Sequence, residues 1–334
     1  MSVSIKDIAR KANVSPSTVS RALNDHPRIS LETKEQIRAL AKAMGYVPSM
    51  AARTLVGKPP VTIGVAISDF LDPFYVDLLS SIEDAVIAND YRIFVSSFYR
   101  DRGRELRLSD AFYERRFAGI VVAGSLVDDG YLSQSWRHTM PAVLVNCPSY
   151  IFSVSVDQLA GARAAVEHLI SLGHCRIAYV TQGDRSNTDT QRLNSYRAVL
   201  QEHNIPTDSD LIIDGDGGIA GGIRAVAPLL DMAEPPTAIF CFNDMTAIGV
   251  INALQRRGYR VPGDFSVVGF DDIDIASYYF PPITTVRQPV YEMGQMAVTK
   301  LFALIRGSEN VGPALLTPEL VVRDSTAAAP LERR

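Results

Sequence analysis

Hydrophobic residues in the first 46 positions recur at the spacing of short amphipathic helices. Ser4 and Asp7 have capping-box spacing, with the shorter acid in place of the usual Glu. The apolar face that follows repeats at i, i+3, i+4 and i+7 and consists of Ile5, Ile8, Ala9 and Ala12. The pattern predicts a helix of two turns with one buried face.

A second and a third short helix are predicted to share a small core with the first. Asn13 tolerates the left-handed backbone that a sharp turn needs. Ser15 can then cap a helix with Pro16 at its first position, whose inner face would be Val19, Ala22 and Leu23. A third helix opens at Ser30, ends at Gly45 and would bury Ile37, Leu40, Ala41 and Met44. The polar side chains of the second helix then point away from the core, which is the form of a helix-turn-helix.

From residue 61 onward, apolar runs of strand length alternate with amphipathic stretches of helix length. The runs are VTIGVAI, YRIFVSS, GIVVAG, AVLVNC, CRIAYVT, TAIFCFN and FSVVGFDD. Apolar strands that alternate with helices are typical of parallel sheets covered on both faces. Two such sets, near residues 61–157 and 158–286, predict an α/β core of two doubly wound subdomains. Ligands of such sheets bind at the carboxyl ends of the strands, here in the cleft between the two subdomains.

Polar and aromatic residues follow the predicted strands at those carboxyl ends. They are Ser68, Asp69, Phe74, Tyr75, Asn146, Asn243 and Asp271, and QGDRSNTDTQR follows a further strand. Aromatic rings stack on C–H faces, and charged groups form bidentate hydrogen bonds, so this set suits a small hydroxyl-rich molecule. The alternative for Asn243 and Asp271 is that each only caps the next helix.

Charge is distributed unevenly along the 334 residues, whose net charge is −4. Residues 1–58 contain ten Lys and Arg and four Asp and Glu, a charge of +6, which leaves −10 for the rest. A basic head on an acidic body predicts that the head binds a polyanion, and the helix-turn-helix pattern indicates that this polyanion is double-stranded DNA.

The alternative for the second helix is a solvated surface helix. Residues 49–60 are either a plain linker or a hinge that becomes helical only on DNA.

Other motifs indicate metal, cofactor or catalytic chemistry only weakly. Cys147, Cys175 and Cys241 lie far apart without C-x-x-C spacing, and His168 and His174 do not complete a zinc pattern with Cys175. GDGGIA matches a dinucleotide-binding fingerprint formally, but its neighbouring acidic residues would repel a pyrophosphate. The sequence contains no evident nucleophile–base pair, secretory core or apolar run long enough to span a membrane. We therefore expect a cytoplasmic protein without metal, cofactor or enzymatic activity.

The order of motifs along the whole chain closely resembles the lactose-repressor/galactose-repressor (LacI/GalR) family of bacterial transcription regulators. The resemblance rests on IKDIARKANVSPSTVSRALND, GYVPSMAARTL, HLISLGHCRIAYV, RLNSYRAVL, PTAIFCFNDMTAIGV and VPGDFSVVGFDDIDIASYYFPPITTVRQP. It implies a homodimer that binds a pseudo-palindromic operator, and a periplasmic-binding-protein-like core whose cleft takes a small-molecule effector. The parts would be a helix-turn-helix domain at 1–48, a hinge at 49–60, one subdomain at 61–157 with about 290–315, and the other at 158–286 with about 316–330.

The resemblance also implies roles for particular residues. It puts Pro16, Ser17 and Arg21 at base-reading positions, and near phosphates it puts Ser15, Thr18, Ser20, Asn24 and, just beyond, Arg28. Leu55 corresponds to the hinge leucine that enters the minor groove at the operator centre. In the cleft the implied effector contacts are Arg192 and Asp271, with Asn243, Ser186 and Thr188 as neighbours and Phe74 or Tyr75 as walls.

Two departures from the family pattern change these expectations. Gly217 stands in a loop where family members often carry an aromatic residue, which removes a stacking wall. The chain ends at Arg334 without the leucine heptads of tetrameric relatives, so a dimer is expected.

The effector is expected to be a sugar or a sugar derivative, with nucleobases as the next class. Its binding should change whether two hinge helices can pair on DNA. The alternative function is a sugar-binding receptor without regulatory DNA binding.

Overall fold

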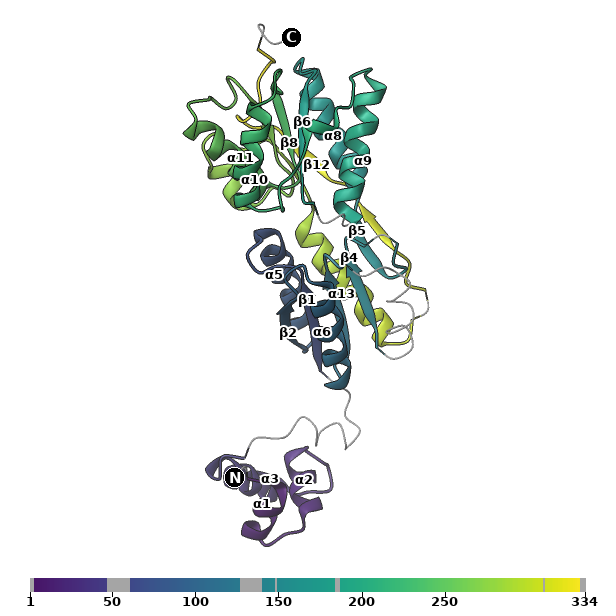
Figure 1. Ribbon diagram of the computed structural model, residues 1–334. Helices are drawn as coiled ribbons and strands as arrows, with labels where there is room; N and C mark the ends of the chain where they lie inside the picture. Colours follow the sequence, from purple (N-terminus) through teal and green to yellow (C-terminus); the bar gives the residue numbers. More distant parts are fainter. Residues whose placement is uncertain are drawn as a thin grey trace. The chain divides into compact units, whose positions relative to one another are not determined.

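The computed structural model describes residues 3–46, 61–126, 140–147, 149–183, 187–308 and 310–330 (Figure 1). The chain divides into two compact units, Met1–Pro60 and Val61–Arg334. The predicted hinge with Leu55, and the predicted effector contact Ser186, lie outside the described residues. Among the helices of the described ranges, none has the length and apolar character needed to cross a membrane.

Three short helices form the first unit: α1 (Ile5–Ala12), α2 (Pro16–Leu23) and α3 (Leu31–Ala43). The predicted capping box opens α1, and the turn after it passes through Asn13 at φ 53°. The three helices bury a small common core of Ile8, Ala9, Val19, Ala22, Ile37 and Ala41. Because α2 has only eight residues, its position depends on this packing rather than on its own stability.

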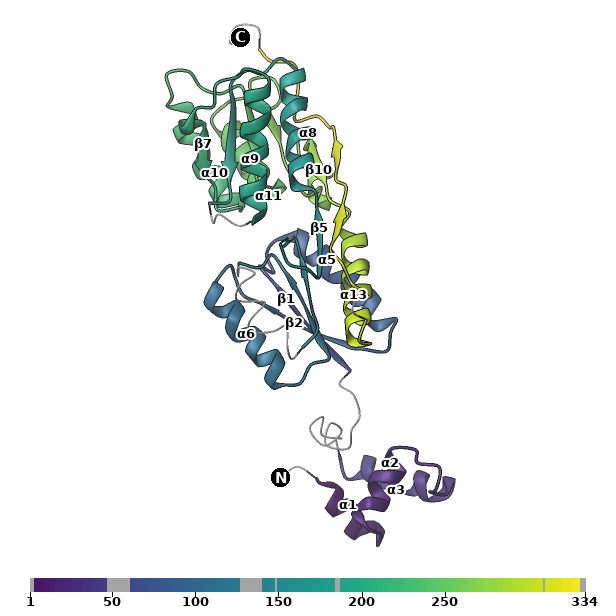
Figure 2. The same cartoon turned by 90° about the vertical axis from the view of Figure 1, so that its right-hand side faces the viewer.

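The first lobe of the second unit is built on a parallel sheet of six strands. In spatial order these are β11 (Ala314–Leu316), β5 (Ser153–Val156), β4 (Ala142–Val145), β3 (Gly119–Ala123), β1 (Thr62–Ile67) and β2 (Arg92–Ser97). Helices α5 (Pro73–Ile87) and α13 (Val290–Ile305) pack together on one face of the sheet, and α6 (Arg102–Glu114) covers the other (Figure 2). Strands β1, β3 and β4 are therefore buried along their whole length.

The second lobe has a parallel sheet of four strands. In spatial order they are β7 (Ile212–Asp214), β6 (Ile177–Thr181), β8 (Ala238–Cys241) and β9 (Ser266–Val268). One face is covered by α8 (Gln158–Ser171) and α9 (Asn187–Glu202), and the other by α10 (Ile219–Leu230) and α11 (Asp244–Arg256). A Cβ on Gly222 would lie 2.2 Å from the Thr246 carbonyl oxygen, so this glycine permits the close contact of α10 with α11.

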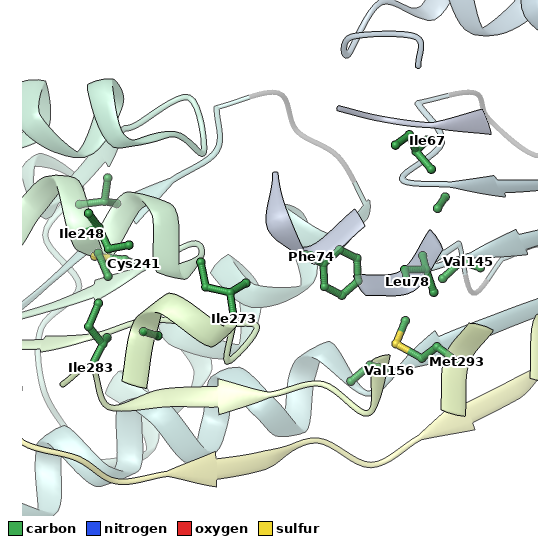
Figure 3. Close-up of a cluster of buried hydrophobic side chains, with 14 of the residues drawn as sticks. Ile67, Phe74, Leu78, Val145, Val156, Cys241, Ile248, Ile273, Ile283 and Met293 are labelled. Atoms are coloured by element: carbon green, nitrogen blue, oxygen red, sulfur yellow. The ribbon is translucent and has the colours of Figure 1, made fainter. Parts of the chain in front are cut away.

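The chain passes between the lobes three times. Strand β5 leads into α8, β10 (Thr285–Arg287) leads into α13, and β11 is followed by β12 (Glu319–Val321). Strands β10 and β12 pair antiparallel and contact α8. One apolar cluster extends through both lobes, and Phe74 and Ile273 lie between its two halves (Figure 3). The predicted class is confirmed, since an all-α head is followed by an α/β core with two parallel sheets covered on both faces.

Candidate functional site

Helix α2 presents a polar face that its own first turn organises. The Ser15 hydroxyl oxygen accepts a hydrogen bond from the Thr18 N–H at 3.1 Å and lies 2.7 Å from the Ser17 hydroxyl. Val19 has no exposed surface and holds the helix on the core. The three side chains expected to contact bases are all exposed: Pro16, Ser17 and Arg21. The predicted base-reading set therefore lies on the solvent face of a helix that is fixed by packing and by its cap.

The residues expected near phosphates surround this face. Ser15 caps the helix, Thr18 and Ser20 are half-buried, and the Asn24 amide donates to the Ser20 carbonyl oxygen at 2.9 Å. Arg28 is exposed beyond the end of α2. Within the described part of the head, neither Arg28 nor Arg21 takes part in a salt bridge. Their charges are therefore available to a polyanion.

A pocket lies where the carboxyl ends of the two parallel sheets face each other. Seven of the predicted effector contacts line it: Ser68, Phe74, Tyr75, Asn146, Thr188, Arg192 and Asp271. In the rest of the lining, Gln182 and Asn187 belong to the predicted segment QGDRSNTDTQR, and the residues not singled out are Asp72, Arg100, Gly124, Ser125, Leu126, Phe242 and Gln288. The expected position of the cleft followed from the rule that the carboxyl ends of parallel strands meet at one edge of a sheet. The rule does not indicate residues that follow a further loop or lie in a segment that crosses between the lobes.

Two predicted contacts do not line the pocket. The Asp69 carboxylate accepts a hydrogen bond from the Leu71 N–H at 3.0 Å and so organises its own turn. Asn243 is buried, caps α11 by accepting from the Thr246 N–H at 2.9 Å, and donates to the Gly217 carbonyl oxygen at 3.0 Å. The capping alternative considered for Asn243 is thus the one that the geometry supports, and contact of Asp69 or Asn243 with an effector stays a prediction.

Arg192 of α9 is the most enclosed charge in the pocket, with 2% of its surface exposed. Its guanidinium lies over the Phe270 ring at 3.5 Å from the centroid, and its Nε donates to Gln158 Oε1 at 2.9 Å. One Nη donates to the Phe242 carbonyl oxygen, and the other lies 3.6 Å from Asp271 Oδ1. Burial lowers the pKa of Arg192, and the Asp271 carboxylate opposes this shift. The arginine is thereby held in one orientation by groups from several segments.

Asp271 and Gln288 connect the lobes through hydrogen bonds. The Gln288 amide donates to Asp271 Oδ1 at 2.6 Å, and its oxygen lies 3.4 Å from Gln158 Nε2 and 3.5 Å from Asn146 Nδ2. Asp271 and Asn146 both have positive φ, 112° and 59°, which is unusual for residues other than glycine. Burial raises the pKa of Asp271 well above its ordinary value, and Arg192 opposes this. Strained strand ends joined by a polar network are typical of a binding site.

Tyr75 is positioned by the opposite wall of the pocket. Its hydroxyl forms a hydrogen bond with Ser68, and burial raises the pKa of the phenol above its ordinary value. An added Cβ on Gly124, which has φ 73°, would lie 2.2 Å from the Tyr75 hydroxyl oxygen. Glycine at this strand end therefore leaves the space that the tyrosine occupies.

The loop of GDGGIA faces Arg100 across the pocket rather than forming a nucleotide site. Arg100 Nη1 donates to the backbone carbonyl oxygen of Asp216. Gly215 packs against Val180, since an added Cβ would lie 2.4 Å from Val180 Cγ1. An added Cβ on Gly217 would lie 3.1 Å from Arg100 Nη1. The glycines of this segment thus allow close packing and make room for a guanidinium.

Comparison with known proteins identifies the family of the chain and the type of its two parts. Residues 4–49 match the family described as bacterial regulatory proteins, lacI family, and residues 166–326 match a periplasmic binding protein-like domain. The chain is 32% identical over 330 residues to the HTH-type transcriptional repressor CytR of Escherichia coli (strain K12), covering 98% of this chain and 97% of CytR. The chain belongs to the lacI family. The predicted family and the predicted function of a DNA-binding transcriptional regulator are confirmed.

Solved structures of other lacI-family proteins have the same architecture. The lac repressor dimer bound to operator and the anti-inducer ONPF matches with a TM-score of 0.84 and 29% identity, covering 98% of this chain and 100% of that one. The complex of the transcriptional regulator CelR with cellobiose matches with a TM-score of 0.73 and 27% identity, covering 97% and 99%. The lacI-family fold is therefore shared over nearly the full length of all three chains.

Proposed function

We propose that this chain is a repressor whose operator affinity is controlled by a sugar or a sugar derivative bound in the cleft of the core. The observation that carries the proposal is the position of Gln288, which contacts Asp271, Gln158 and Asn146 from both lobes. A ligand at this network touches both lobes, so its affinity depends on how the lobes are arranged. Binding then shifts the population of lobe arrangements, and the same shift changes DNA affinity.

The chemistry of the pocket supports a polyhydroxyl ligand and a binding role rather than a catalytic one. Asp271 and Asn146 offer polar groups to hydroxyls, and Arg192 adds a fixed cation among them. Tyr75 and Phe242 add aromatic surface suited to the C–H face of a sugar ring. The ONPF and cellobiose complexes of two family members support the same class of ligand.

On the operator, we propose that α2 lies in the major groove. Arg21 can donate two hydrogen bonds to a guanine edge, Ser17 one to a base, and Pro16 only an apolar contact. Ser15, Thr18, Ser20, Asn24 and Arg28 would contact phosphates, and Leu55 would enter the minor groove, as the family resemblance implies. We also propose a cytoplasmic location, because the DNA to be regulated lies there.

Exposed apolar side chains on the core support a homodimer. Leu71, Tyr278 and Phe280 are 80%, 79% and 82% exposed. The pKa of Asp77 in α5 is raised by burial and by Asp274 in α12 (Asp274–Tyr278), so these two helices approach each other. The lac repressor, which matches nearly the whole chain, is a dimer on its operator. A pseudo-palindromic site mirrors such twofold symmetry.

Selection of DNA by the full-length protein, followed by titration at a fixed salt concentration, tests the DNA-binding part. Arg21→Ala should weaken operator binding by about 1–3 kcal/mol and reduce the ratio of operator to random-DNA affinity. Arg38→Ala is the matched control, since Arg38 lies on α3 and not on α2, and is paired with Asp25 at 2.5 Å. An unchanged ratio for Arg21→Ala, or no enriched sequence in the selection, would favour the receptor alternative.

A further inference from the structure

The cleft contains a second arginine that the network around Arg192 does not use. Arg100 follows β2, has a left-handed backbone with φ 57°, and lines the pocket. Its Nη1 donates to the Asp216 carbonyl oxygen on the other lobe. Its Nε is buried and has no hydrogen-bond partner in the described residues. A buried donor without an acceptor is rare, so its presence in a pocket indicates an acceptor supplied by a ligand.

The free edge of the Arg100 guanidinium has a definite shape. Nε and Nη2 lie on the same edge and form a planar pair of donors that matches the two oxygens of a carboxylate. The hydrogen bond that the Arg100 side chain makes within the described part of the chain is donated by Nη1. Nη2 therefore has no acceptor among these residues. Neither donor of this edge thus has an acceptor among the described residues, and the side chain lines the pocket.

The charges around the two arginines differ. Arg192 lies 3.6 Å from Asp271, so its charge already has a counterion. Arg100 forms no salt bridge among the described residues, although its charge opposes the rise that burial causes in the pKa of Asp72 in the same pocket, and the nearest residue of the opposite loop is Gly217. Asp72 also lines the pocket, with its Oδ1 accepting from the Phe74 N–H at 3.1 Å. Arg100, which forms no salt bridge with a described residue, is therefore better placed than Arg192 to bind an anionic ligand.

We propose that the effector is a sugar that carries a carboxylate, and that Arg100 binds this carboxylate through Nε and Nη2. The inference rests on the proposed function, because it names the ligand class of the same cleft. Hydroxyls of the ligand would contact Asp72, Asn146 and Asp271, and the carboxylate would lie at the lobe interface beside Asp216. Since Arg100 already touches the opposite lobe, an anion held there also affects the contact between the lobes.

Binding of sugar acids and of their neutral parents by the full-length protein tests the proposal. The probes are the uronates and aldonates of the common hexoses and pentoses, the parent sugars, and the hexose 6-phosphates, each measured by calorimetry at fixed ionic strength. We expect at least one acid to bind about 10-fold or more tightly than its parent sugar, as two charge-assisted hydrogen bonds predict. A protein that binds no acid better than the parent sugar, or that prefers a 6-phosphate, overturns the proposal.

Three variants then show whether Arg100 causes the preference. Arg100→Gln should lose most of the preference for the acid, and Arg100→Lys, which keeps the charge but not the paired donors, should keep an intermediate part. Arg224→Gln is the matched control, because Arg224 pairs with the Asp216 carboxylate but is 62% exposed and does not line the pocket. A full preference in folded Arg100→Gln overturns the assignment. Operator binding by the wild-type protein without ligand is measured in parallel, and its absence would show separately that the DNA-binding proposal fails.

Discussion

The head and the cleft position their polar side chains in opposite ways. In the head, Pro16, Ser17 and Arg21 come from one short helix and are exposed to solvent. In the cleft, Arg192 and Gln288 come from distant parts of the chain and are 2% and 4% exposed. The first set needs only a cap and a small core beneath one helix. The second needs two complete sheets and the segments that cross between them.

This difference predicts how each site responds to substitution. An exposed polar residue that is removed loses its contacts with a partner molecule and little else. A buried one also leaves its neighbours without hydrogen bonds or counterions, and this desolvation cost is larger than the bond itself. Variants of the head should therefore change DNA binding at nearly constant stability, whereas variants of the cleft should change stability and ligand response together.

Arg192→Ala should have the largest effect of the variants considered. It leaves the Asp271 carboxylate buried without its cation and removes the hydrogen bond to Gln158. Breaking a buried pair in this way costs about 3–5 kcal/mol, which urea unfolding would measure, and the effector response should be lost. The matched control is Arg163→Ala, whose partner Glu202 is 52% exposed, and it should cost about 0–1 kcal/mol. Equal losses for the two arginines would contradict the contrast between buried and exposed charges.

A pH series on Asp244 gives the next largest effect. This carboxylate is fully buried, accepts from the Thr285 hydroxyl at 2.6 Å, and burial raises its pKa from 3.8 to about 7. Between these values the folded protein holds a proton that the unfolded chain has lost. Its contribution to the free energy of unfolding is therefore complete at low pH and falls by about 2 kcal/mol from pH 5 to pH 7.

The variant Asp244→Asn cannot titrate, so the difference in stability between variant and wild type isolates this group. That difference should change by about 2 kcal/mol in favour of the variant between pH 5 and pH 7, in urea unfolding at constant ionic strength. Parallel curves for the two proteins would show that Asp244 is ionised in the folded state throughout this range. Burial of Asp244 would then cost less free energy than the contrast between the buried cleft and the exposed head assumes.

Sequence reasoning predicted the head more completely than the cleft, for physical reasons. Caps, turn residues and the helical repeat are local, so the chain near Ser15 and Asn13 carries its own structural signal. Most of the seven apolar runs of the core were recognisable because strands buried on both faces are apolar throughout, and of these strands only β2, at the edge of its sheet, is partly exposed. Strand β5 was missed because its sequence SVSV is half polar. Strands β10, β11 and β12 were missed because each has only three residues and, unlike the equally short β9, lies in no longer apolar run.

The unpredicted parts of the cleft depend on topology rather than on local sequence. Gln288 lies in the segment between β10 and α13, and its contacts come from residues 17 to 142 positions away. Arg100 meets Asp216 across 116 positions. The strand-end rule does not indicate Gln288, and after β2, where Arg100 lies, no residue was singled out. Asn243 is a local case, because its cap of α11 follows from the strand-end pattern, while its contact with the effector stays a prediction.

The cap of α2 tests whether the structure of the head depends only on contacts between residues that are close in sequence. Ser15→Ala removes the acceptor for the Thr18 N–H and should destabilise the helix by about 1 kcal/mol. Hydrogen exchange of the Thr18 amide in the full-length protein would measure this as roughly fivefold faster exchange. Ser20→Ala, further along α2, is the control and should leave that amide unchanged, because Ser17 itself contacts the Ser15 hydroxyl. Acceleration that spreads into α8 or α9 would show that the head and the core are not independent.

Pro16 gives the smallest and most specific test of the exposed face. A proline at the first position of α2 has no N–H and no side-chain donor, so at its base it offers only apolar contact, for which a thymine methyl is suited. In the selected operator, each thymine is replaced in turn by uracil, which removes one methyl group. At one position in each half-site this replacement should weaken operator binding by the wild-type protein by up to about 0.8 kcal/mol, the value for one buried carbon.

With Pro16→Ser the same replacement should cost almost nothing. With Arg21→Ala the loss at that position should remain, because Arg21 contacts a different base. A wild-type protein that is insensitive at every thymine would mean that Pro16 caps the helix without contacting a base.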